Sequence, residues 1–158
     1  MSRKIITSKR FPEKDFKYDH FLVNLLINRI LKNGKKQLAK RIVYQAFEFI
    51  EYRSQQNPLL IFEKAVRNVS PRVQLKTKRK GGSTLQIPTL VTKFRSINFA
   101  IRWLVTFSRK RGGKGMPIKL ANEILEASKG LGNAVRKKEE THKMAEANKA
   151  FAQTNFDD

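Results

Sequence analysis

The sequence predicts a mainly α-helical protein: a six-helix, bundle-like core with a protruding two-stranded antiparallel β-ribbon and a flexible basic N-terminal arm. Six segments repeat apolar residues at helical spacing, and one segment alternates apolar and polar residues as a β-strand does. Residues 1–18 carry six Lys or Arg and few candidates for a core. A chain of 158 residues with 40% hydrophobic content supports one domain, which we place at residues 19–158 after the arm.

The first three predicted helices fill the first half of the chain. An apolar-periodic run in residues 21–30 forms the first, with Asp19 as its expected N-terminal cap and Gly34 as its C-terminal stop. A second, strongly amphipathic helix is predicted over about residues 36–53. The Asn-Pro pair at residues 57–58 has the pattern of a cap followed by a first helical residue, and the next Ser-Pro pair is expected to end this third helix.

A β-ribbon is predicted at about residues 72–91, where helical spacing gives way to alternation. Residues 81–83 form the expected turn, and Pro88 restricts the return strand to an edge-like position. Residues 72–80 would extend roughly 30 Å at about 3.3 Å each, so the distal half of the ribbon is expected to project from the core. Leu75 and Leu85 are expected to pack. Five cations are expected to line a groove on one face of the ribbon, namely Arg72, Lys76, Lys78, Arg79 and Lys80.

The last three helices follow the ribbon. The fourth, around residues 97–107, combines an aliphatic face with an aromatic stripe, so we expect it to be the central helix of the bundle, with the aromatic residues in the core. A Lys, Arg and Gly loop at residues 109–115 precedes a fifth helix that starts at Pro117. The sixth, over about residues 133–151, is mostly polar and is expected to dock weakly and to offer one face to a partner.

The charge predicts an anionic partner. Lys and Arg number 34 against 13 Asp and Glu, giving a formal charge of +21. The acids lie toward both ends of the chain: residues 64–122, a stretch of 59 residues, contain none and hold 15 Lys or Arg. A merely solvated basic surface is the alternative, but neighbouring acids would cancel the field that phosphates feel, and here they are missing. We therefore expect a nucleic acid.

Residues for catalysis are not found. The two histidines, His20 and His142, are too few and too far apart for a local metal site, and the single Glu-x-x-His spacing from Glu139 has no second copy. Residues 112–115 lack the first glycine and the Ser or Thr of a nucleotide-hydrolase loop. With no Cys, no disulfide or thiolate site is possible. We expect no enzyme activity, no metal, no cofactor and no membrane segment.

Four segments resemble one family, the small-subunit ribosomal protein seven of the bacterial and organellar type, from about residue 19 to residue 152. The Gly-Lys-Lys at residues 34–36 with Ile-Val-Tyr at 42–44 is similar to the start of the family's second helix. Residues 81–84, with Gln86 and Pro88, resemble its hairpin tip. Residues 102–105 with 109–111 resemble its fourth helix and the following loop, and residues 137–152 resemble its last helix.

The resemblance implies six helices and a protruding ribbon, direct binding to the 3′ major domain of small-subunit ribosomal RNA, and a role in nucleating assembly of the subunit head. It places the protein near the exit-site transfer RNA and the messenger RNA path, beside other head and platform proteins, and not as a homo-oligomer. The expected ribosomal RNA contacts are Arg3, Lys4, Lys9, Arg10, Lys35, Lys36, Arg72, Lys76, Lys78, Arg79, Arg95, Arg102, Arg109, Lys110, Arg111 and Lys114. The residues expected to face the exit-site transfer RNA and messenger RNA are Lys80, Gly81, Gly82, Ser83, Arg136, Lys137 and Lys143.

The chain departs from the family pattern in places. Leu85 stands where relatives often have Tyr or His, Lys80 where an apolar residue is common, and the chain closes on two acids. Residues 102–111 and 129–142 look most like the cyanobacterial and plastid branch, which suggests a ribosome in the plastid stroma, with the bacterial cytoplasm as alternative. Two other functions fit a helical core with a basic ribbon: a free-standing regulator that binds messenger RNA, and an architectural DNA-binding protein.

Overall fold

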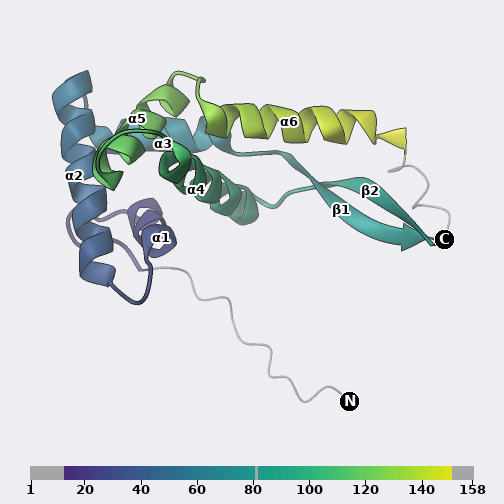
Figure 1. The fold of residues 1–158 in the computed structure, drawn as a ribbon, viewed down its shortest axis with the longest axis horizontal. Helices are drawn as coiled ribbons and strands as arrows, with labels where there is room; N and C mark the ends of the chain where they lie inside the picture. Colours follow the sequence, from purple (N-terminus) through teal and green to yellow (C-terminus); the bar gives the residue numbers. More distant parts are fainter. Residues whose placement is uncertain (1–12, 81, 151–158) are drawn as a thin grey trace, which may run out of the picture.

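The computed structural model describes residues 13–80 and 82–150, which form six α-helices and one two-stranded antiparallel sheet, as predicted (Figure 1). The helices gather at one end and the ribbon extends away from them, with α6 running beside its base (Figure 1). The elements in chain order are α1 (Phe21–Ile30), α2 (Lys36–Ser54), α3 (Pro58–Val69), β1 (Val73–Lys80), β2 (Ser83–Leu90), α4 (Lys93–Lys110), α5 (Met116–Ser128) and α6 (Asn133–Ala147). In the part of the chain described, no helix has the length and apolar character needed to cross a membrane.

The N-terminal cap of α1 corrects one prediction. His20, not Asp19, is the cap residue, and its imidazole Nδ1 accepts a hydrogen bond from the backbone N–H of Leu22 at 3.3 Å. Asp19 has a left-handed backbone (φ 44°) and its carboxylate pairs with Lys14 Nζ at 2.9 Å instead. At the other end, Leu31 caps the helix, and Gly34 belongs to the turn that leads into α2.

The predicted start of α3 is confirmed in detail. Asn57 is the cap, its Oδ1 accepts from the N–H of Leu59 at 2.9 Å, and Pro58 opens the helix. A proline costs nothing there because its missing N–H would have no partner within the helix. Ser70 ends the helix before Pro71, also as predicted.

The core lies where the helices cross. Phe47 of α2, Phe62 of α3, and Leu120 and Ile124 of α5 are fully buried in it. The prediction that α4 is the central helix is wrong. The most extensively packed helix is α5, which contacts α2, α3, α4 and α6. The reason is that α4 keeps one long face in solvent, where its cations lie, whereas the short α5 is enclosed by its neighbours.

The ribbon has the predicted strands but a different arrangement of faces. The register pairs Leu75 with Pro88 and Lys78 with Leu85, and directly paired residues share a face of the sheet. Leu75 and Leu85 therefore lie on opposite faces, and Arg79 lies on the Leu75 face, away from Lys76 and Lys78. The prediction that all these cations line one face is wrong: the ribbon carries positive charge on both. Its distal half does project, because residues 76–79 are exposed.

One hydrogen bond joins α6 to the base of the ribbon. The backbone N–H of Arg72 donates to Nε2 of His142 at 3.1 Å, so the imidazole must be neutral at that nitrogen. Burial lowers the pKa of His142, and the positive charges of Lys138 and Arg72 lower it further. Both histidines are thus structural: His20 caps α1, and His142 joins α6 to the ribbon.

Acidification is expected to weaken this contact. Because the pKa of His142 is depressed in the folded protein, its stabilising contribution is complete above the ordinary value of 6.5 and is lost as the pH falls below that value. We expect His142→Ala to cost roughly 1 kcal/mol in urea unfolding near neutral pH, and this difference from the wild type to shrink toward about pH 5. The wild type and the variant share all other titrating groups, so the contribution of those groups to the pH dependence cancels in this difference. A difference that stays constant with pH would contradict the role given to His142.

Candidate nucleic-acid interface

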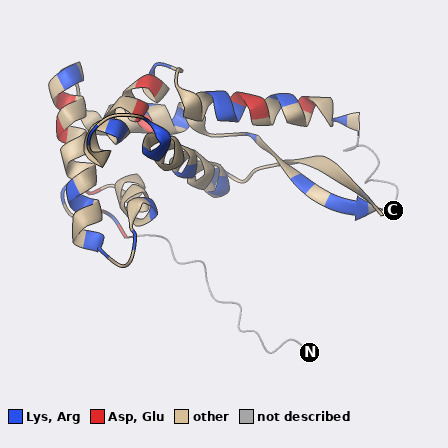
Figure 2. Cartoon of the chain, in the orientation of Figure 1, with Lys and Arg blue, Asp and Glu red and all other residues tan. Residues whose placement is uncertain are grey.

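Positive charge follows the ribbon and α4, whereas α2, α5 and α6 carry both signs (Figure 2). This distribution follows from the acid-free stretch of the sequence, because residues 64–122 include the end of α3, both strands, α4 and the following loop. A surface of one sign strengthens the attraction for a polyanion. The surface therefore suits a phosphate backbone.

The exposed face of α4 presents an aromatic ring between two guanidinium groups. Arg95 and Arg102 lie four and three residues from Phe99, and their Cζ atoms stand 5.7 and 5.8 Å from the centre of its ring. Phe99 in turn stacks on Trp103, with 5.9 Å between ring centres. Cation–π contacts of this kind hold a guanidinium in place without neutralising it. Arg95 and Arg102 are thus exposed, oriented and available to phosphate.

Arg29, in the last turn of α1, joins this surface and was not among the predicted contacts. Burial lowers the pKa of Arg29, and the positive charge of Arg102 on α4, a helix that packs against α1, lowers it further. Such a pair costs energy in the free protein, and a phosphate between the two groups would remove that cost. Sequence spacing gave no signal for Arg29, because its closeness to α4 arises only in the folded chain.

A second basic cluster forms where the turn before α2 meets the end of α4. A groove of about 370 Å³ is lined by Lys32, Lys35 and Arg109 together with apolar residues such as Leu38 and Met116. Arg109 Nη2 donates to the carbonyl oxygen of Ile30 at 3.1 Å, which holds the side chain over the groove. Two of the predicted contacts, Lys35 and Arg109, are therefore brought together from distant parts of the sequence. Lys36, Lys110 and Lys114 are exposed nearby in the chain.

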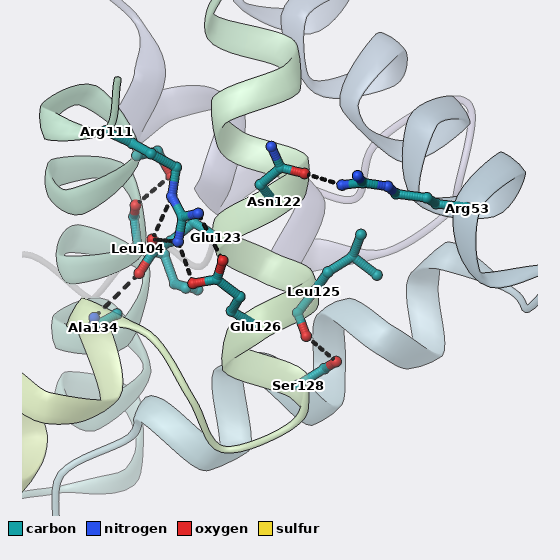
Figure 3. A network of polar contacts seen from close by, with 10 residues as sticks. Arg53, Leu104, Arg111, Asn122, Glu123, Leu125, Glu126, Ser128 and Ala134 are labelled. Carbon is teal, nitrogen blue, oxygen red and sulfur yellow. Dashed lines mark hydrogen bonds and ion pairs between the residues drawn. The ribbon is translucent and has the colours of Figure 1, made fainter. Parts of the chain in front are cut away.

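Arg111 differs from the other cations of its loop. Its Nη2 lies 2.7 Å from Glu123 Oε2 and its Nη1 lies 2.7 Å from Glu126 Oε1 (Figure 3). The hydrogen bonds with Glu126 raise the pKa of Arg111 and lower that of Glu126. Because both ends of its guanidinium are engaged by carboxylates of α5, Arg111 has a structural role, and it is not among the proposed RNA contacts.

The carboxylate of Glu123 also fixes the start of α6. Its side chain is fully buried, and its Oε1 accepts from the backbone N–H of Ala134 at 3.1 Å (Figure 3). A negative group at a helix N-terminus satisfies a free donor and interacts favourably with the helix dipole. One residue of α5 thus holds both the basic loop after α4 and the first turn of α6.

The residues predicted to face the exit site differ in their surroundings. Arg136 and Lys143 are exposed on α6, and Gly82 lies at the ribbon tip. Lys137 pairs with Glu140 at 3.0 Å. Only the backbone of Lys80 and Ser83 is described, and the two residues pair across the strands, so Ser83 belongs to β2 and not to the turn. Five predicted residues lie outside the described part, namely Arg3, Lys4, Lys9, Arg10 and Gly81.

Two further exposed cations, Arg67 and Lys93, were missed and lie with Arg72 around the base of the ribbon. Lys138 is engaged differently, since its Nζ donates to the carbonyl oxygen of Asn68 at 2.7 Å. Among the residues the structure describes, no group of three or more His, Asp or Glu is placed to hold a metal ion. The described surface is therefore defined by its cations.

Known proteins match this chain over nearly its whole length. The model of the family "Ribosomal protein S7p/S5e" matches residues 2–149. "Small ribosomal subunit protein uS7c" of Trieres chinensis is 54% identical over 144 residues, covering 91% of this chain and 91% of the relative. "Small ribosomal subunit protein uS7" of Thermosynechococcus vestitus is 51% identical over 156 residues, covering 99% of this chain and 100% of the relative.

The helical fold with its cationic ribbon, together with these matches, defines a structural ribosomal protein and not an enzyme. The chain belongs to the ribosomal protein S7p/S5e family. The family resemblance predicted from its four segments is thereby confirmed.

Proposed function

We propose that this protein is a constituent of the small ribosomal subunit that binds the 3′ major domain of the ribosomal RNA directly and helps to nucleate assembly of the subunit head. The observation that carries the proposal is the cationic surface of α4 and the ribbon, on a chain whose relatives are named as small-subunit proteins. Lys and Arg contacts to phosphates supply affinity and position, and structured RNA is recognised largely by its shape.

The proposed contacts with ribosomal RNA combine predicted residues with four that the structure adds. The helical core presents the exposed cations of α4 and the groove lined by Lys32, Lys35 and Arg109. The ribbon extends further along the RNA. The proposed residues within the described part are Arg29, Lys32, Lys35, Lys36, Arg67, Arg72, Lys76, Lys78, Arg79, Lys93, Arg95, Arg102, Arg109, Lys110 and Lys114. Arg3, Lys4, Lys9 and Arg10 of the N-terminal segment remain proposed contacts as well.

We place the ribbon tip and α6 toward the exit-site transfer RNA and the messenger RNA path. Both elements extend from the same end of the core, and α6 contacts β1, so they form one continuous projection (Figure 1). Arg136 and Lys143 on α6 supply exposed charge there. Proteins of the head and platform are the proposed protein neighbours, in a ribosome of the plastid stroma or of a bacterial cytoplasm.

Binding to RNA across a salt series tests this function. We expect the purified protein to prefer the 3′ major domain RNA over an unrelated structured RNA of equal length, at least tenfold at about 0.15 M salt. Charge alone would give equal and steeply salt-dependent binding to both RNAs, and that result would contradict the proposal. Equal affinity for duplex DNA would instead favour an architectural DNA-binding protein.

Sedimentation separates a ribosomal constituent from a free regulator. On a sucrose gradient of cell or plastid lysate, the protein should migrate with small subunits. A regulator that binds messenger RNA would remain mainly at the top of the gradient. Recovery there, with small subunits depleted of the protein, would overturn membership in the subunit.

A further inference from the structure

An apolar groove of about 590 Å³ lies at the base of the ribbon, where α1, α3, the end of β2 and the start of α4 meet. Its floor is made largely of aliphatic side chains, among them Leu22, Val66, Val91 and Ile97. The volume falls within the range of roughly 300–1,000 Å³ that is usual for sites that hold small molecules or parts of larger ligands. Nothing in the interface described above uses these side chains.

Leu90 at the mouth of this groove is unusually open to solvent. It is the last residue of β2, and its side chain is 85% exposed although it lines the groove. A single exposed leucine is unremarkable on a protein surface, but one placed over an apolar depression extends the apolar area that a ligand would cover. The groove and Leu90 together form a surface that gains stability when it is covered.

Cations surround the groove. Arg67 of α3, Arg72 before β1 and Lys93 at the start of α4 line it, all three are exposed, and none forms an ion pair with another described residue. The acid among the lining residues, Glu63, is paired with His20 Nε2 at 2.9 Å. The site is therefore apolar inside and positive at its rim.

We infer that this groove accepts one unstacked nucleobase of the RNA, with the phosphates on either side of that nucleotide held by Arg67, Arg72 and Lys93. The inference rests on the proposed RNA-binding function and adds the chemical class of nucleotide that the site takes. An extruded base offers a flat apolar face between two negative charges, which matches an apolar floor inside a cationic rim. An apolar protein side chain would fit the floor but would leave the three cations without a partner.

Two hydroxyl groups in the groove provide hydrogen-bond acceptors for a base. Ser70 Oγ donates to the carbonyl oxygen of Val66 and Ser96 Oγ donates to that of Pro71, each at 2.7 Å. Each hydroxyl hydrogen is used within the protein, so the oxygens remain free to accept from an amino or ring N–H. Bases in a duplex cannot reach such a site, because stacking and pairing hold them in the helix. The groove thus selects a loop, bulge or single-stranded nucleotide.

A substitution without charge change tests the inference. Leu90→Ser is expected to lower affinity for the 3′ major domain RNA about fivefold, on the order of one partly lost base contact, and to leave the salt slope unchanged because no phosphate contact is removed. The matched control is Leu60→Ser, an exposed leucine (63%) on α3 outside the lining of the groove. Both variants should melt near the wild type. Equal affinity of Leu90→Ser and Leu60→Ser would overturn the inference.

Cross-linking identifies the occupant. With p-benzoylphenylalanine in place of Leu90, irradiation of assembled small subunits should give one reverse-transcription stop at an unpaired nucleotide. A cross-link to a protein, or to a paired nucleotide, would overturn the inference. The wild-type preference for the 3′ major domain RNA is measured separately, so failure of the proposed function shows in the wild type, whereas failure of the groove inference shows only in the position-90 variants.

Discussion

Glu123→Gln is expected to lower the free energy of unfolding by about 3 kcal/mol, because it replaces a fully buried, doubly hydrogen-bonded carboxylate by an amide that satisfies only one of its two donors. The Glu123 side chain has no exposed surface and takes Arg111 on one oxygen and the Ala134 N–H on the other. Glutamine preserves the shape, but its NH2 group would face a donor in either orientation, the Arg111 guanidinium or the Ala134 N–H. For a chain of this size the melting temperature should fall by roughly 6–12 °C. Urea and thermal unfolding measure both quantities.

Substitutions of two other glutamates serve as controls for this loss of stability. Glu126 also binds Arg111, but its side chain is 43% exposed, so Glu126→Gln should cost less than half as much. Glu139 is exposed on α6, and Glu139→Gln should change the unfolding free energy by no more than about 0.5 kcal/mol. If Glu123→Gln unfolds at the same urea concentration as Glu139→Gln, the carboxylate does not hold the loop and α6 together.

Helix positions were predictable where local chemistry decides them. The Asn57–Pro58 pair fixes the start of α3 through a side-chain hydrogen bond and a residue that needs no donor, and both are local effects. At α1, two neighbouring residues were able to cap. Asp19 is the commoner cap type, yet it lies one position too early, and His20 supplies the acceptor. Propensity alone did not decide between them.

Which side chains share a face of the ribbon depends on the register of the two strands, and composition does not determine that register. Each strand alternates correctly by itself, but the side on which Leu85 falls relative to Leu75 depends on which residues pair across the turn. A shift of one residue would have put both leucines on the same face. Positive charge on both faces is the consequence.

The sequence predicted the charge of the candidate interface but not the arrangement of its cations. The acid-free stretch predicted that cations would dominate α4 and the ribbon, and they do. The same reasoning treated Arg109 and Arg111 as equivalent, although one lies over an open groove and the other is bound by two carboxylates. Arg29 was overlooked because its neighbour on α4 is distant in sequence. Partners of this kind are set by tertiary packing.

Arg95→Gln with Arg102→Gln should weaken binding to the 3′ major domain RNA by roughly 30-fold at about 0.15 M salt, since each removes one charge-assisted contact to phosphate. The slope of log affinity against log salt should become shallower by about 1.4–1.8, the value for two phosphates. The fold should survive, because both side chains are exposed and the loss of Arg102 removes a like charge beside Arg29. Filter binding over a salt series measures affinity and slope together.

Lys64→Gln with Lys129→Gln removes the same net charge elsewhere. These two lysines are exposed and line a polar groove between α3 and α5 that also contains Glu126, so the local field there is partly cancelled. If charge acted only through the net value of +21, both double variants would lose affinity equally. A loss confined to the α4 pair would indicate phosphate contacts at α4 itself, because both double variants remove the same net charge. Equal losses would instead contradict a defined interface on α4.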